Sequence, residues 1–338
     1  MEHTLHRIAT IALILTALLL GACAAPNSYD MGHPWRTVYA LHIMNSDGTG
    51  HRILATGSIG EVLLADSSIF VTQYSYGLLA AAYGDSSATQ LYAGIDFNFC
   101  SLSMDRSKVL LTSISPAGNE LYVMNANGTH LAKLEAPIGA YALPQLSPDL
   151  DEIAFSRQSC ICTMYLDGSN FQTIRVPTDT SQCDYPRYVD QNRLLYTEIV
   201  HYTTWTNTGW ISLRLFDKNN RTDSPVTEYS RLLYSSAQNA FSGDTLLCID
   251  MQESYASLLN LNSKQVTALR PARWASFSPD GSMIICGDSR DIGIIKVASG
   301  NAQLVYSEPD ANQWVVDAEI SPDNKYIVFR TLVPKMPR

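Results

Sequence analysis

The chain has 338 residues, of which 46% are hydrophobic and 16% are charged, and its formal net charge is -9. This share of apolar residues is enough to build a packed core, so a disordered or fibrous chain is excluded. The acidic balance and the lack of a Lys/Arg run predict no nucleic-acid partner, because proteins that bind a phosphate backbone cluster their basic residues.

The first residues have the pattern of an export signal. An apolar run over Ile8–Leu20 follows a weakly basic start, and it is shorter than the ~20 apolar residues that a transmembrane helix needs. A Gly-Ala pair then precedes Cys23, in a pattern that resembles the bacterial lipobox. That resemblance implies cleavage before Cys23 and a diacylglyceryl group on its thiol; an ordinary signal peptide with a coincidental cysteine is the alternative. We expect a signal peptide over residues 1–22 and a lipidated tether over residues 23–35.

A protein acylated in this way is exported and held at a membrane, since each buried methylene contributes ~0.8 kcal/mol to anchoring. The first expected partner is therefore the cell membrane or the outer membrane, with the protein facing the periplasm or the cell exterior. Ala24 rather than Asp follows Cys23, and by resemblance to lipoproteins this favours the outer membrane where the host has one.

The rest of the chain is built from a repeat with two signatures. The first is Ser-Pro-Asp before an apolar strand; complete copies start at Ser147, Ser278 and Ser321, and weaker copies contain Asp66, Asp105, Asp190 and Asp244. The second is a strand that ends in Asn-Gly or Asp-Gly, with glycines at Gly48, Gly128 and Gly168. These dipeptides supply the positive φ that two-residue hairpin turns need, so each repeat is expected to hold two hairpins.

Copies of the first signature follow one another at spacings of 36 to 53 residues. This period is typical of one four-stranded antiparallel blade per repeat. The chain starts with only the second hairpin, Val38–Leu54, and finishes with only the first, Val315–Thr331, so the two would complete one shared blade. We predict one all-β domain over residues 36–332, a seven-bladed β-propeller, and a tail over residues 333–338. Six blades are the alternative, because the copy at Asp66 is degenerate.

The two signatures together resemble the WD40-like repeats of TolB-like propellers, which also occur beside the catalytic domains of prolyl oligopeptidase relatives. The resemblance covers residues 36–332, and it is to the propeller part of TolB alone. It implies the fold and no particular activity, because the repeated residues are turn and core residues.

No sequence motif for catalysis is found. The chain contains no Gly-x-Ser-x-Gly elbow, no Gly-x-x-x-x-Gly-Lys phosphate loop and no His-Glu-x-x-His zinc helix. The histidines of the mature part, among them His42, His51 and His130, are not expected to converge, which argues against a metal-dependent lyase. We therefore expect no enzyme activity, no cofactor and no metal.

The cysteines beyond Cys23 divide into two groups. Cys248 and Cys286 occupy a core position of the repeat, so both are expected to be buried thiols. An even number of cysteines in an exported protein invites disulfides, and Cys183 is expected to pair with a cysteine of the preceding repeat, for which we choose Cys162.

The arrangement of connections predicts a binding face. In a four-stranded blade the first and third connections lie on one face of the disc, and the second connections and the links between blades lie on the other. The two signatures occupy the first face, so the second receives the longer segments, including Gln73–Gln90 and Glu198–Trp210. Binding residues often lie on loops and are often aromatic, and the aromatic residues selected here are Tyr74, Tyr76, Tyr202, Trp205 and Trp210. The alternative is that these rings pack on neighbouring blades.

The expected function is that of a membrane-anchored scaffold that binds an envelope protein or a glycan. One alternative is a propeller enzyme that acts on a polysaccharide or a peptide. A second is a structural or sensor subunit with a permanent partner in an envelope complex. A shallow mouth rich in His, Asp and Arg would favour the enzyme, whereas an aromatic, loop-rich rim favours binding.

Overall fold

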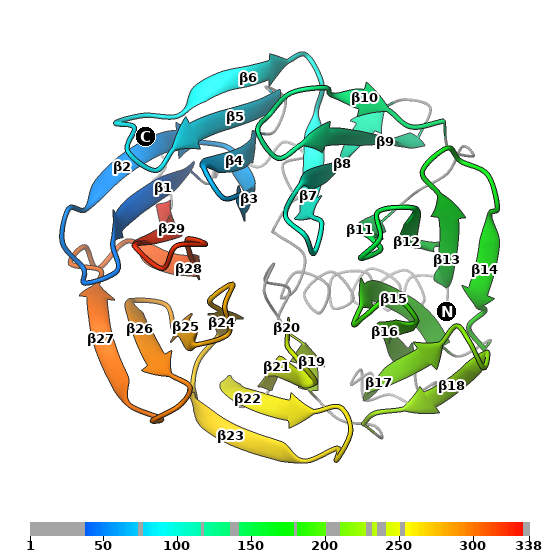
Figure 1. Ribbon diagram of the computed structural model, residues 1–338. Coiled ribbons are helices and arrows are strands. Elements are labelled where there is room, and N and C mark those ends of the chain that lie inside the picture. The colour runs from blue at the N-terminus through cyan, green and yellow to red at the C-terminus, as the bar shows by residue number, and fades with distance from the viewer. Residues whose placement is uncertain are drawn as a thin grey trace, which may run out of the picture.

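The structure is a computed structural model, and it describes residues 38–73, 77–115, 118–135, 142–178, 181–200, 210–227, 232–234, 241–250 and 254–333. Within these ranges the chain forms strands and turns and no helix, so none of the described residues belongs to a helix that could cross a membrane. Seven antiparallel sheets stand around a common centre like the blades of a propeller (Figure 1). The predicted seven-bladed, all-β propeller is confirmed, and the six-bladed alternative is wrong.

Blades are numbered in chain order, and their strands are given from the centre of the ring outward. Blade 1 contains β3 (Ile59–Leu64), β4 (Ser68–Gln73), β5 (Gly77–Ala82) and β6 (Thr89–Ala93), and blade 2 contains β7 (Phe97–Leu102), β8 (Lys108–Ser115), β9 (Gly118–Asn125) and β10 (Ala132–Lys133). Blade 3 contains β11 (Ala142–Leu146), β12 (Glu152–Arg157), β13 (Cys160–Tyr165) and β14 (Gln172–Arg175), and blade 4 contains β15 (Ser181–Tyr188), β16 (Arg193–Val200), β17 (Trp210–Asp217) and β18 (Thr222–Pro225).

The remaining blades include one with a divided inner strand and one that is shared by the two ends of the chain. Blade 5 contains β19 (Leu232–Tyr234) and β20 (Phe241–Ser242), which both pair with β21 (Thr245–Asp250), followed by β22 (Tyr255–Asn260) and β23 (Val266–Pro271). Blade 6 contains β24 (Trp274–Phe277), β25 (Met283–Gly287), β26 (Asp291–Lys296) and β27 (Ala302–Ser307), and blade 7 contains β28 (Trp314–Ile320), β29 (Tyr326–Val333), β1 (Val38–Asn45) and β2 (Arg52–Gly57).

Blade 7 closes the ring. β1 pairs antiparallel with β29 in an unbroken register from Val38↔Val333 to Asn45↔Tyr326. The sharing of one blade by the first and last hairpins, as predicted from the sequence, is confirmed. This pairing covers the sheet edges that an open row of blades would leave exposed.

The core lies between the blades, because alternate residues of each strand point to opposite neighbours. Leu41 and Ile43 of β1 face blade 1, where they pack with Ile69 and Val71. Phe329 of β29 faces blade 6 and packs among apolar residues of β25 and β26. Each blade therefore depends on both neighbours for the burial of its side chains.

The Ser-x-Asp turns of the first signature hold the first connections together through one carboxylate. In blade 6, Ser278 Oγ donates to Asp280 Oδ1 at 2.6 Å, and the backbone N–H of Ser282 donates to the same oxygen at 3.0 Å. Partial burial raises the pKa of Asp280, but these hydrogen bonds outweigh that effect and lower the pKa to about 2. The same carboxylate accepts a hydrogen bond from Asn324 Nδ2 of blade 7 at 2.8 Å. The turn signature thus also ties one blade to the next.

Two names are used below for the faces of the disc. The turn face carries the first and third connections of each blade, and the link face carries the second connections and the links between blades. Because strands alternate in direction, β16 ends and β17 begins at the link face.

Replacement of Phe329 by alanine tests the closure of the ring. Phe329 is 1% exposed; its ring stacks on His42 of β1 at a centroid distance of 4.7 Å and lies tilted against Tyr306 of β27 at 4.8 Å. We expect Phe329→Ala to lower the free energy of unfolding by ~3–5 kcal/mol, measured by urea denaturation. The control Leu304→Ala removes a side chain that is 58% exposed on β27 and should change stability by less than ~0.5 kcal/mol. Equal effects of the two substitutions would contradict the described packing.

Candidate functional site

The predicted binding face is the link face, and the structure describes part of it. The selected residues outside the described ranges are Cys23, Tyr74, Tyr76, Tyr202 and Trp205. Trp210 is the first residue of β17, opposite Val200 at the end of β16. The end of β16 and the start of β17, which flank residues 201–209, therefore both lie at the link face.

The sequence had indicated that Gln73–Gln90 is one long segment on the link face, and this is wrong. β5 runs through its middle, so only residues 74–76 connect strands at the link face. Tyr83 lies in the following turn on the opposite face, where its ring stacks on Tyr326 at 5.4 Å and its hydroxyl donates to Ala65 O at 2.7 Å. Tyr83 is a packing residue.

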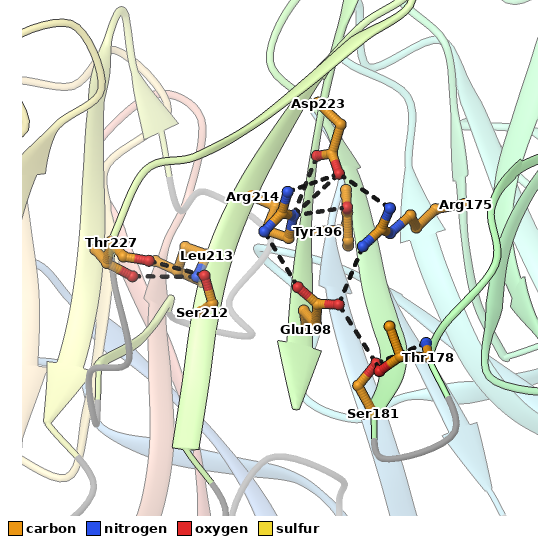
Figure 2. A network of polar contacts seen from close by, with 10 residues as sticks. All are labelled: Arg175, Thr178, Ser181, Tyr196, Glu198, Ser212, Leu213, Arg214, Asp223 and Thr227. Atoms are coloured by element: carbon orange, nitrogen blue, oxygen red, sulfur yellow. Dashed lines mark hydrogen bonds and ion pairs between the residues drawn. The ribbon is translucent and has the colours of Figure 1, made fainter. Parts of the chain in front are cut away.

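Four charged side chains form a network between blade 3 and blade 4 (Figure 2). Two of them, Glu198 and Arg214, belong to β16 and β17, the strands that flank residues 201–209. Arg214 of β17 contacts two carboxylates, with Nη2 at 2.9 Å from Asp223 Oδ2 and Nη1 at 3.2 Å from Glu198 Oε2. Arg175 of β14 reaches the same carboxylates, at 3.3 Å from Glu198 Oε1 and 3.6 Å from Asp223 Oδ2. Tyr196 accepts a hydrogen bond from Arg214 Nε at 3.1 Å. Two arginines that share two carboxylates thus join the two blades.

The charged network is largely shielded from water. The Glu198 and Asp223 side chains are 9% and 16% exposed. Burial opposes the charged form of Arg214, but the hydrogen bond to Asp223 and the nearby Tyr196 outweigh it and raise the pKa of the guanidinium. Partly buried pairs of this kind gain little net stability, because desolvation offsets the attraction, but they favour one geometry. The network fixes β16 and β17 against β14.

A second contact holds the outer side of β17 at the same level. Ser212 Oγ donates to Thr227 O at 2.8 Å, and Thr227 Oγ1 accepts a hydrogen bond from the Leu213 N–H at 3.1 Å (Figure 2). The strands that flank residues 201–209 are therefore fixed by the charged network on one side and by the Thr227 contacts on the other.

Sequence reasoning missed two tryptophans on the link face. Trp314 and Trp274 are the first residues of β28 and β24, so both lie at the link-face end of an innermost strand. Trp314 is 40% exposed. Trp274 is held in place, because its Nε1 donates to Asp288 O at 3.1 Å and a Cβ at Gly287 would lie 2.4 Å from its ring. Each lies a few residues before a complete Ser-Pro-Asp signature, four for Trp274 and seven for Trp314, and this was the signal that could have found them.

The expected disulfide between Cys162 and Cys183 is absent, and the six described cysteines are free thiols. Cys162 points toward blade 2 and packs with Phe155, whereas Cys183 points at the opposite face of blade 3 and packs with Ile161. Alternation along β13 puts Ile161 and Cys162 on opposite faces, so one sheet separates the two thiols. Burial, reinforced by the nearby Glu198 carboxylate, raises the pKa of Cys183 to about 12.

Cys248 and Cys286 are buried thiols, as predicted. Burial raises the pKa of Cys248 to about 12 and that of Cys286 to about 11. Because the thiolate is the reactive form of cysteine, both side chains serve packing.

His42 and His51, which were expected to lie apart, are hydrogen-bonded. His42 Nδ1 lies 2.8 Å from His51 Nε2, and His42 Nε2 lies 2.8 Å from Thr331 Oγ1. The hairpin of β1 and β2 brings them together, since His42 pairs with Ile53, two residues after His51. Within the described residues no group of three His, Cys, Asp or Glu side chains is placed to hold a metal ion.

No family model and no curated protein matches the chain. Solved structures share its fold. An oligogalacturonate lyase in complex with manganese is 10% identical, with a TM-score of 0.56 over 88% of this chain and 91% of the lyase. A protein described as TolB from Agrobacterium tumefaciens is 13% identical, with a TM-score of 0.50 over 89% of this chain and 99% of that protein. A puromycin-hydrolyzing peptidase of Mycobacterium tuberculosis is 14% identical, with a TM-score of 0.58 over 84% of this chain and 55% of the peptidase.

At these identities the likeness shows the fold alone. The chain is a TolB-like propeller in its architecture, which confirms the resemblance predicted from the two repeat signatures.

The buried histidine pair predicts a pH-dependent stability. Burial, with a smaller effect of His51, lowers the pKa of His42 to about 4 from its ordinary 6.5. Between these values the unfolded chain binds more protons than the folded one, so stability is complete above pH 6.5 and falls as the pH decreases toward 4. At ~1.4 kcal/mol per pKa unit, the loss is ~3 kcal/mol.

Denaturation of wild type and His42→Phe at several pH values measures this loss. The phenylalanine keeps the stack on Phe329 and removes the titrating group, so the difference between the two unfolding free energies should change over this range. His130→Gln, at an exposed turn, is the control and should follow wild type. Parallel pH curves for wild type and His42→Phe would refute the assignment.

Proposed function

We propose that the protein is exported, held at a membrane by a lipid on Cys23, and that its link face binds an envelope protein or a glycan. The observation that best supports a binding role is the network of Arg175, Glu198, Arg214 and Asp223. This network joins the strands that flank residues 201–209 to blade 3 as well as to blade 4. Binding residues usually lie on loops that a rigid scaffold positions. Because β16 and β17 are already fixed, binding at this face need not order these two strands.

Aromatic side chains would supply the contact area for the partner. Trp205 and Trp210 belong to this part of the chain, and Trp314 is 40% exposed on the same face. Tryptophan is enriched among the residues that dominate binding energy at interfaces. The selected residues Tyr74, Tyr76 and Tyr202 remain part of the proposed surface.

A second candidate function is that of an enzyme acting on a polysaccharide or a peptide. It is favoured by the likeness in fold to propellers described as an oligogalacturonate lyase and a peptidase. New reducing ends or cleaved peptides, released by the purified protein, would support it over a pure scaffold.

The lipid anchor is tested by Cys23→Ser. Without the thiol no diacylglyceryl group can be attached, so we expect the exported variant to move from the membrane fraction to the soluble fraction. Cys160→Ser changes a thiol that is half-buried in blade 3 and should leave the protein at the membrane. Retention of Cys23→Ser at the membrane would show that another part of the chain anchors it.

The link face is tested by Trp205→Ala and Trp210→Ala. Partners captured by crosslinking in native membranes would be identified with the wild type, and their affinity for each variant measured with purified proteins. Loss of a central tryptophan should weaken binding by at least ~30-fold, which corresponds to ~2 kcal/mol. Phe171→Ala removes an exposed ring from the turn face and should have no effect. Equal affinities for all variants would argue against this face.

A further inference from the structure

A groove of about 1020 Å³ opens on the turn face between blade 3 and blade 4. Thr163, Ile174 and Phe216 line its floor, and Glu152 and Lys218 line its wall. Its size is at the upper end of the ~300–1,000 Å³ typical of small-molecule sites. A ligand here would be distinct from the partner proposed above, because the groove lies on the opposite face of the disc.

The groove exists because blade 3 departs from the repeat in one layer of its core. The layer is defined by one pair of residues in each blade. The first is the residue two positions before the end of the third strand, and the second is its partner on the second strand. Both side chains point to the next blade. In blade 3 these residues are Thr163 and Ala154. In the other six blades both are apolar and at least one is large: Ile43–Val328, Ala80–Phe70, Val123–Leu110, Leu215–Leu195, Leu258–Leu247 and Ile294–Ile285. The smaller pair of blade 3 leaves space beside Phe216.

Thr163 also places an unsatisfied hydroxyl directly beneath the surface of the groove. Its side chain is 1% exposed, and its Oγ1 has no hydrogen-bond partner among the residues that the structure describes. A buried hydroxyl without a partner is destabilising, and a valine would fill the same space without this cost. A ligand hydroxyl bound in the groove would supply the missing partner.

An aromatic ring stands at the mouth of the groove. Tyr165 is the last residue of β13 and is 44% exposed. The last residues of the third strands in the other blades are not aromatic: Asn45, Ala82, Asn125, Asp217, Asn260 and Lys296. Two departures from the repeat, one on the floor and one at the mouth, therefore occur at the same groove.

The polar lining of the groove is mixed, with an excess of negative charge. Glu152 and Lys218 form an ion pair, so their charges cancel at the wall of the groove. The other charged lining residues are three carboxylates, Asp149, Asp151 and Asp167, and one cation, Arg221. Side-chain amides also line the groove. Such a lining offers both hydrogen-bond donors and acceptors, and its charge disfavours an anion.

We infer that the groove binds a short neutral saccharide. Each sugar hydroxyl both donates and accepts hydrogen bonds, which matches carboxylates, amides and the free hydroxyl of Thr163. The apolar face of a sugar ring packs on an exposed aromatic side chain such as Tyr165. The excess of carboxylates excludes an acidic sugar by like-charge repulsion.

Calorimetric titration of the full-length protein, in a detergent without a sugar headgroup, tests this assignment. The neutral probes are cellohexaose, maltohexaose and mannohexaose; oligogalacturonate is the acidic probe and spermidine the cationic one. We expect at least one neutral probe to bind with a Kd of ~1 μM to ~1 mM and at least ~10-fold more tightly than the charged probes. No binding of any neutral probe, or tightest binding of a charged one, would overturn the assignment.

Two variants separate binding from a structural role. Thr163→Val should raise the Tm of the free protein and yet weaken saccharide binding by ~10-fold, because it removes the unsatisfied hydroxyl and the ligand's partner together. Tyr165→Asn, which introduces the residue found at this position in three other blades, should weaken binding by at least ~10-fold without changing the Tm. Unchanged affinity in both variants would overturn the assignment.

The matched control is Phe171→Ala. Phe171 is another exposed ring of blade 3, 37% exposed and outside the groove lining, and its loss should leave saccharide affinity unchanged. Capture of a link-face partner by Thr163→Val and Tyr165→Asn should also remain as in wild type. The tests of the link-face site and of the groove can thus give independent results.

Discussion

The pairing of β1 with β29 is the constraint on which the rest of the molecule depends. Its unbroken register joins strands from the two ends of the propeller into one sheet. The cores on both sides of that sheet contain residues from both ends of the chain, with Leu41 and Val328 facing blade 1 and Met44 and Phe329 facing blade 6. Once the ring is closed, each blade has two neighbours, and the direction of every strand decides which connections reach which face. The positions of both proposed sites follow from this closure.

The interface between blade 3 and blade 4 differs from the others in its layers. The charged network with Arg175 and Arg214 lies on the strands toward the link face, apolar residues such as Leu194 fill the middle, and the groove above Thr163 opens at the turn face. Apolar residues of similar size would pack more stably in place of ion pairs and an unsatisfied hydroxyl. Proteins depart from the rules of stable packing mainly where function requires it. This interface is therefore where we place function on both faces.

The fold could be predicted from the sequence because its evidence is repeated. The degenerate copy at Asp66 did not prevent the prediction of seven blades, because six other copies established the repeat period. The side-chain sites could not be predicted in the same way, because each occurs once. Cys162 was assigned a disulfide, although the alternation of one strand puts it on the wrong face of the sheet. His42 and His51 meet across a hairpin whose register is shifted by a bulge, which repeat alignment does not show.

Closure also determines how an anchored propeller would stand on its membrane. Val38 pairs with Val333 at the link-face end of β29, so the chain enters the propeller on the link face. The segment from Cys23 to Val38 can span at most ~50 Å when fully extended, at ~3.3–3.6 Å per residue. With the lipid on Cys23, the tether would therefore join the propeller on its link face. A partner at the link face would bind on the side of the tether, whereas a saccharide in the groove beside Tyr165 would bind on the opposite side.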